Sequence, residues 1–86
     1  MNYRDNGLID VFCKISDPDT MERFFEEIFT DSERRDLSLR WELMRRLRQR
    51  VPQRQIAADL GISLCKITRG AKILKDRTSV SSSMLK

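Results

Sequence analysis

Hydrophobic residues recur at helical spacing along most of the chain. One face of a helix collects apolar residues at i, i+3, i+4 and i+7, and three stretches follow this rule. The first is Leu8, Val11, Phe12 and Ile15, the second is Met21, Phe24, Phe25, Ile28 and Phe29, and the third is Leu37, Trp41, Met44 and Leu47. No stretch alternates as a half-buried strand would. The pattern therefore predicts an all-α protein.

Capping chemistry predicts where two of these helices begin. Asp17 is a good helix cap and Pro18 fits a first helical turn, so the second helix is expected to start there. Thr30 and Glu33 have the spacing of a capping box, in which each side chain accepts a hydrogen bond from the other residue's backbone N–H. The third helix is expected to begin at this pair.

The segment from Gln53 to Lys72 resembles a helix-turn-helix, a motif that binds DNA. Ala57 is small enough to let a second helix approach the first. Gly61 can turn the chain at positive φ without steric cost. Ile67 is expected to plug the gap between the two helices.

The ends of this motif are also indicated. Pro52 is expected to start its first helix, and Ser63 to cap its second. The second helix, from about Ser63 to Leu74, would be the recognition helix. Beyond Lys75 the sequence is typical of a tail that is disordered or only loosely helical.

Three regions follow from this organisation. Residues 1–50 are expected to form a helical dimerisation region, 51–75 the DNA-binding helix-turn-helix, and 76–86 the tail. Leu39 and Leu43 widen the apolar surface of residues 37–47 beyond one helix face. A chain of 86 residues rarely buries a large core alone, so a homodimer is expected.

Charge is distributed unevenly along the chain. Residues 1–36 hold five basic and ten acidic residues, a net charge of −5. Residues 37–86 hold twelve basic and three acidic residues, a net charge of +9. This asymmetry indicates that the second half faces nucleic acid.

Enzyme and metal chemistry find little support in the sequence. The chain has no His, and Cys13 and Cys65 lack the spacing of a metal site and a base to activate either thiol. No catalytic or metal site is therefore predicted. No apolar stretch approaches the roughly 20 residues of a membrane helix, and nothing resembles a secretory signal. We expect a cytoplasmic protein that contacts no membrane and needs no cofactor.

The recognition helix supplies most candidate DNA contacts. Its N-terminal residues should meet base edges in the major groove, and they are Ser63, Leu64, Cys65, Lys66 and Thr68. Lys66 can donate to guanine acceptors, whereas Leu64 and Cys65 can contact thymine methyls. Gln53 and Arg54 should meet the DNA backbone or an edge base, and Lys72 and Lys75 should pair with phosphates. The basic run Arg45, Arg46, Arg48 and Arg50 is either a solvated face or a further phosphate contact.

Several runs of residues resemble the Trp repressor family. They are Thr30-Asp31-Ser32-Glu33-Arg34, Arg40, Gln53-Arg54-Gln55-Ile56, and Ile67-Thr68-Arg69-Gly70 with Leu74-Lys75. The resemblance covers about residues 20–75, and the Ile-Thr-Arg-Gly run is its most specific part. It implies an intertwined all-helical homodimer, an operator as target and L-tryptophan as corepressor.

The resemblance also implies a ligand site. Arg40 and Arg69 would bracket the indole ring, because a guanidinium plane can stack on an aromatic ring and still bind a carboxylate. Thr30, from the partner subunit, would lie at the polar end of the ligand. Gly70 would leave space beside the ring.

Two other interpretations stay open. Ile73 stands where the tryptophan-binding pattern has a small polar residue, so the chain can also be a DNA-binding member of the superfamily that needs no tryptophan. An interpretation of another class is a helical module that binds a protein through its Phe-rich face. Salt-dependent binding to duplex DNA would exclude the module, and a titration with L-tryptophan would separate the two DNA-binding interpretations.

Overall fold

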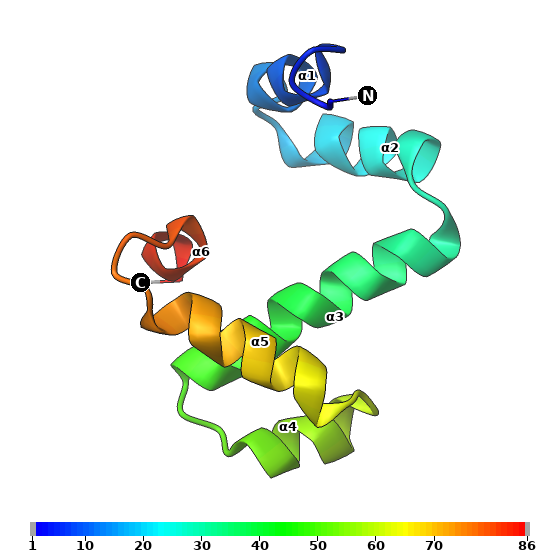
Figure 1. Ribbon diagram of the computed structural model, residues 1–86. Coiled ribbons are helices and arrows are strands. Elements are labelled where there is room, and N and C mark those ends of the chain that lie inside the picture. Colours follow the sequence, from blue (N-terminus) through cyan, green and yellow to red (C-terminus); the bar gives the residue numbers. More distant parts are fainter. Residues whose placement is uncertain (1, 86) are drawn as a thin grey trace. The chain divides into compact units, whose positions relative to one another are not determined.

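The computed structural model describes residues 2–85, and every regular element in this range is a helix. The helices are α1 (Leu8–Lys14), α2 (Pro18–Ile28), α3 (Asp31–Arg48), α4 (Gln53–Leu60), α5 (Leu64–Lys75) and α6 (Val80–Met84) (Figure 1). The predicted all-α class is confirmed. The chain divides into two compact units, residues 1–34 and 35–86, and each is described by itself. None of the helices within residues 2–85 combines the length and the apolar character needed to cross a membrane.

Aromatic rings join α1 to α2 in the first unit. Phe12 meets Phe24 and Phe25 edge to face, with ring centroids 5.3 and 5.9 Å apart. Such geometry is favoured because the positive edge of one ring faces the negative face of another. Neither α1 nor α2 holds a fully buried residue. The predicted Phe stripe is thus the contact between these helices, and it stays half-exposed in the single chain.

The start of α2 has the predicted cap. The Asp17 carboxylate accepts a hydrogen bond from the backbone N–H of Thr20 at 2.9 Å, and Pro18 occupies the first helical position. Hydrogen bonding by Thr20 holds the pKa of Asp17 below its usual range, because the bond favours the charged carboxylate.

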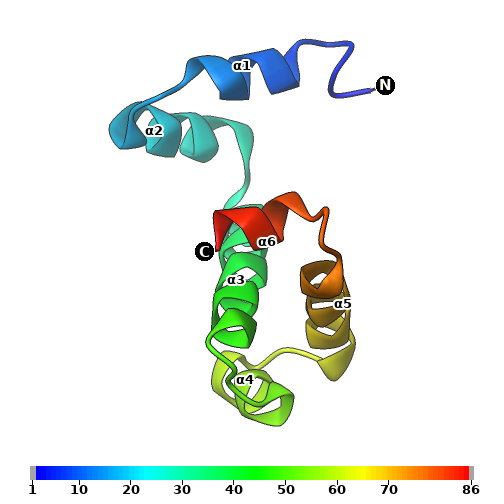
Figure 2. The ribbon, with the colours of Figure 1, turned by 90° about the vertical axis from the view of Figure 1, so that its left-hand side faces the viewer.

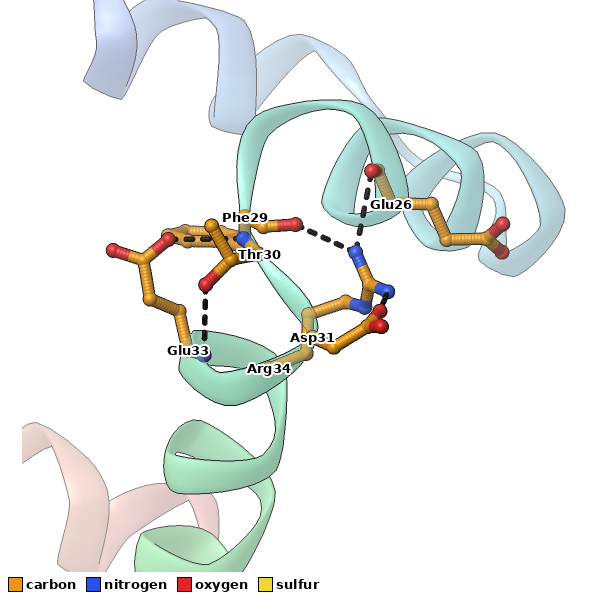
Figure 3. Close-up of polar contacts among 6 residues, drawn as sticks. All are labelled: Glu26, Phe29, Thr30, Asp31, Glu33 and Arg34. Carbon is orange, nitrogen blue, oxygen red and sulfur yellow. Dashed lines mark hydrogen bonds and ion pairs between the residues drawn. The ribbon is translucent and has the colours of Figure 1, made fainter.

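The start of α3 has the predicted capping box (Figure 3). The Thr30 hydroxyl accepts from the Glu33 backbone N–H at 3.2 Å, and the Glu33 carboxylate accepts from the Thr30 backbone N–H at 2.9 Å. A contact that the sequence did not reveal lies beside it. Arg34 donates to the backbone carbonyls of Phe29 and Glu26, at 2.6 and 3.2 Å, and also pairs with Asp31. One guanidinium thus satisfies carbonyls at the end of α2 from the first turn of α3.

The core of the second unit lies among α3, α4 and α5. Its buried residues are Leu43, Met44, Ile56 and Ile67, of which both isoleucines are completely buried. In Figure 2, α5 lies beside the C-terminal half of α3, and α4 lies at one end of both. The predicted role of Ile67 as the plug between the helices is confirmed.

The turn of the helix-turn-helix is formed as predicted at Gly61. This residue adopts φ 63° and ψ 37°, a left-handed conformation that glycine tolerates without penalty. Its backbone N–H donates to the carbonyl of Ala57, which also accepts from the Ile62 N–H at 3.3 Å. The prediction for Ser63 is wrong in one respect. Ser63 occupies the cap position of α5, but its side chain makes no capping hydrogen bond.

Residues beyond Lys75 include a short helix. The Ser79 hydroxyl caps α6 by accepting from the Ser82 backbone N–H at 3.1 Å, and Leu85 packs against the core of the second unit. Arg48, at the end of α3, reaches the Ser82 hydroxyl at 3.4 Å. The predicted tail is therefore helical over five residues and contacts the unit to which it belongs.

The apolar surface of α3 is only partly used within the chain. Leu43 and Met44 are buried, but Leu37 and Trp41 are each 41% exposed. Leu37 and Trp41 stand four residues apart and so share one face of α3.

Candidate functional site

The first turn of α5 presents its side chains to solvent. Ser63, Leu64, Cys65, Lys66 and Thr68 are all exposed. The Thr68 hydroxyl donates a hydrogen bond within the helix, to the Leu64 carbonyl at 2.9 Å. A base edge could therefore use the Thr68 oxygen only as an acceptor, or its methyl group. The polar side chains of Ser63, Cys65 and Lys66 form no hydrogen bond within residues 2–85.

The remaining DNA candidates also lie on the surface of the second unit. Gln53 and Arg54 are exposed in the first turn of α4, and Lys72 and Lys75 are exposed in the second half of α5. The three cations form no ion pair within the described part of the chain, and the Gln53 amide forms no hydrogen bond there. Their charges and amide are thus available to an external partner.

Three of the four arginines in the basic run at the end of α3 bond within the chain, and Arg48 does so through the Ser82 hydroxyl. Glu42 accepts from Arg46 at 2.9 Å and from Arg45 at 2.6 Å, and these bonds hold the pKa of Glu42 below its usual range. Arg46 also pairs with Asp59 of α4 at 3.3 Å. Asp59 in turn accepts from Gln55 at 2.8 Å. Arg45 and Arg46 therefore join α3 to its own acidic residue and to α4, which weakens their case as phosphate ligands.

A cavity of about 150 Å³ lies between α3 and α5. Its lining consists of Arg40, Leu43, Met44, Lys66, Arg69, Gly70 and Ile73. Arg40 and Arg69 face it from different helices, and neither forms an ion pair or hydrogen bond within residues 2–85. A volume of this size can hold a benzene-sized group. The lining can thus receive part of an aromatic ring between two cations.

The structure gives Gly70 a packing role that the sequence did not reveal. A Cβ placed on Gly70 would lie 2.6 Å from Leu43 Cδ1, 3.4 Å from Leu47 Cδ1 and 3.6 Å from Met44 Cγ. Its absent side chain points at α3, so the glycine allows α5 to approach that helix closely. Leu43 and Met44 also line the cavity, so Gly70 sets the position of two residues of the lining as well as lining the cavity itself.

The structure brings together three of the four predicted ligand residues. Arg40, Arg69 and Gly70 share the cavity lining. Thr30, which was expected from a partner subunit, does not line the cavity of its own chain, where it caps α3. Four lining residues were not predicted as ligand residues, and two of them, Leu43 and Met44, belong to the core. Lys66 was expected at a base edge, and Ile73 was noted only as a departure from a pattern.

A second hollow adjoins the cavity along α5. Arg69 and Ile73 line both, and the second hollow adds residues from the end of α5 and from α6. These are Lys72, Asp76, Ser79, Val80 and Ser81. Asp76 is engaged by Thr78, whose hydroxyl donates to its carboxylate at 2.7 Å and lowers its pKa.

Comparison with known proteins gives a consistent result. The family model described as Trp repressor protein matches residues 6–86. A Trp operon repressor homolog of Xylella fastidiosa (strain 9a5c) is 41% identical over 70 residues, which are 80% of this chain and 76% of the relative. One from Chlamydia caviae is 32% identical over 75 residues, 83% of this chain and 74% of the relative. No solved structure matches the chain significantly.

Proposed function

This chain belongs to the Trp repressor family, and from that premise we propose that it represses transcription at a specific operator with L-tryptophan as corepressor. The family resemblance is confirmed, and with it a DNA-binding regulator rather than an enzyme. The observation that carries the finer proposal is the cavity between Arg40 and Arg69, which lies against the recognition helix α5.

DNA recognition is assigned to α4 and α5. The exposed first turn of α5 reads base edges, with Lys66 donating to guanine and Leu64 contacting a thymine methyl. Gln53 and Arg54 meet the backbone or an edge base, and Lys72 and Lys75 bind phosphates, which adds affinity without sequence information. Support comes from the exposure of these side chains and from the net charge of +9 on residues 37–86.

A homodimer is assigned to residues 1–50, with 51–75 reading DNA and 76–86 as an accessory tail. Leu37 and Trp41 remain 41% exposed in the single chain, and a second copy would cover them. A dimer also places two recognition helices for adjacent major grooves, roughly 34 Å apart. Its place of action is the cytoplasm.

The corepressor is placed between Arg40 and Arg69. Each guanidinium can lie flat on the indole ring, and either can bind the carboxylate. Thr30, supplied by the second copy, would meet the polar end of the ligand. Because Arg69 belongs to α5, a ring held there sets the tilt of the recognition helix relative to α3.

This tilt couples the ligand to DNA. L-tryptophan shifts the protein toward the DNA-competent state only by its differential affinity for that state. Such coupling free energies are typically ~1–3 kcal/mol. Bound DNA must raise the affinity for tryptophan by the same factor by which tryptophan raises the affinity for DNA. We therefore expect roughly a fivefold to 150-fold gain in operator affinity.

A second candidate is a family member that binds DNA without tryptophan. Ile73 favours it, because this residue lines the cavity and offers no polar group to the ligand. In this case operator binding would be the same with and without tryptophan.

The test is operator affinity, measured by fluorescence anisotropy with and without saturating L-tryptophan. L-tryptophan should raise the operator affinity of the wild type, whereas Arg40→Ala should bind the operator with the same affinity with and without the ligand. Arg35→Ala is the matched control, since Arg35 is an exposed arginine of α3 outside the cavity lining. No tryptophan effect on wild type would remove the corepressor and leave the second candidate.

A further inference from the structure

We infer that the affinity of the cavity between α3 and α5 for aromatic ligands rises with their negative charge. An indole with two carboxylates then binds more tightly than zwitterionic L-tryptophan. This inference rests on the proposed function, because it concerns the same cavity. It gives Lys66, in the protein free of DNA, a role as a third ligand-binding cation besides its proposed contact with guanine, and it specifies the class of ligand.

The charges of the lining carry the inference. Arg40, Lys66 and Arg69 contribute three positive charges, and the lining contains no carboxylate. None of the three cations has an ion-pair partner within residues 2–85. This differs from Arg46, which pairs with two carboxylates at 2.9 and 3.3 Å. Cations gathered at one cavity repel each other, and an anionic ligand relieves that repulsion.

Nearby acidic residues do not neutralise this set. Glu42, on the same helix as Arg40, is bonded to Arg45 and Arg46. Asp76 lines the adjoining hollow with Arg69 and is engaged by Thr78. Neither lines the cavity itself.

The uncharged side chains of this chain's lining offer no strong acceptor to an ammonium group. Leu43, Met44 and Ile73 are apolar, and Gly70 has no side chain. An ammonium group carries three donors, and leaving donors unpaired on binding is costly. The α-amino group of tryptophan therefore finds no strong side-chain acceptor in this lining, and it meets three like charges. Thr30 of the second copy would add a neutral hydroxyl but no negative charge.

The experiment uses four indoles of graded charge and calorimetry on the full chain without DNA. They are cationic tryptamine, zwitterionic L-tryptophan, singly anionic indole-3-propionate and doubly anionic indol-3-ylsuccinate. The cations are solvent-exposed, so each added negative charge should tighten binding by roughly twofold to fivefold. High salt should compress the series, because exposed charges are screened.

Lys66→Met tests the third cation, since methionine keeps an unbranched apolar chain and removes the charge. In this variant the succinate should lose its advantage over the propionate, while both still bind. Lys14→Met makes the same change in net charge far along the sequence, in a residue outside the cavity lining, and should keep the full series. Circular dichroism would verify that both variants fold.

The outcomes separate this inference from the proposed function. Four results would each overturn the inference. They are tryptophan binding most tightly of the four ligands, any binding of tryptamine, no binding of any indole, and an unchanged order of affinities in Lys66→Met. Operator affinity is measured in parallel. If tryptophan raises operator affinity but the indole affinities do not follow ligand charge, the proposed function stands without the inference. If the charge order holds but no indole changes operator affinity, the inference stands and the corepressor role fails.

Discussion

Replacing Gly70 by alanine should destabilise the second unit, although alanine is the better helix former. The new Cβ would lie 2.6 Å from Leu43 Cδ1, and Leu43 is only 2% exposed, so the one space open to its side chain is the cavity that it lines. Overpacking of this kind costs about 1–3 kcal/mol, whereas the glycine-to-alanine gain in helix propensity is about 1 kcal/mol. We expect a net loss of about 1 kcal/mol in the free energy of unfolding.

A double-mutant cycle isolates the steric contribution. Leu43→Val removes the Cδ1 atom that the new Cβ would meet, so Gly70→Ala should cost little or even stabilise in that background. Gly61→Ala is the control substitution. Its Cβ would meet nothing within 4 Å, but its φ of 63° strains any side chain, so its cost should be the same in both backgrounds.

Urea denaturation followed by circular dichroism gives all of these free energies. Protein concentration must be held constant, since association changes apparent stability. The close-approach role of Gly70 would be refuted if Gly70→Ala were as stable as wild type. It would also be refuted if Gly70→Ala cost the same with and without the Leu43→Val substitution.

Three further predictions concern the caps, the DNA contacts and the dimer. The backbone N–H of Thr30 donates to the Glu33 carboxylate and holds its pKa below the ordinary value of 4.5. The stabilisation from this bond is complete above that value and is lost as the pH falls through the lowered pKa, so acid titration by circular dichroism should show a smaller loss in Glu33→Gln, which keeps an acceptor but does not titrate. Lys66→Ala should relax sequence preference by about 1–3 kcal/mol at one base pair, whereas Lys75→Ala should weaken all DNA alike and lower the salt slope by about 1; equal losses on operator and random duplexes would contradict these roles. Sedimentation should find a dimer that Trp41→Glu dissociates, and a folded wild-type monomer at micromolar concentration would exclude it.

Features set by local chemistry were predictable from the sequence. Asp17, the Thr30–Glu33 pair and Gly61 mark helix ends through contacts within three or four residues, and the structure forms each of them. Ser63 is the exception, because its cap position depends only on the backbone while its hydroxyl is left without the expected bond.

The full lining of the cavity was harder to predict, because it depends on how α3 and α5 face each other. A signal was nevertheless present. Lys66, Arg69, Gly70 and Ile73 follow the i, i+3, i+4 and i+7 spacing of one helix face, and Arg40 stands at this spacing from Leu43 and Met44 on α3. Considering charged residues along with apolar ones on that face would have placed Lys66 beside Arg69. The packing of Gly70 against Leu43 had no such signal, since it depends on the distance between the helices.

The contacts of Arg34 have a consequence for the order of folding. Its partners Asp31, Phe29 and Glu26 lie three, five and eight residues away, so the junction between α2 and the first turn of α3 closes on contacts local in sequence. Local contacts need little loop closure and form fast, before distant segments or a second chain can meet. We therefore expect this junction to form while the chain is still alone. A second copy would meet a turn already formed, and Arg34→Ala should slow assembly more than it weakens the assembled protein.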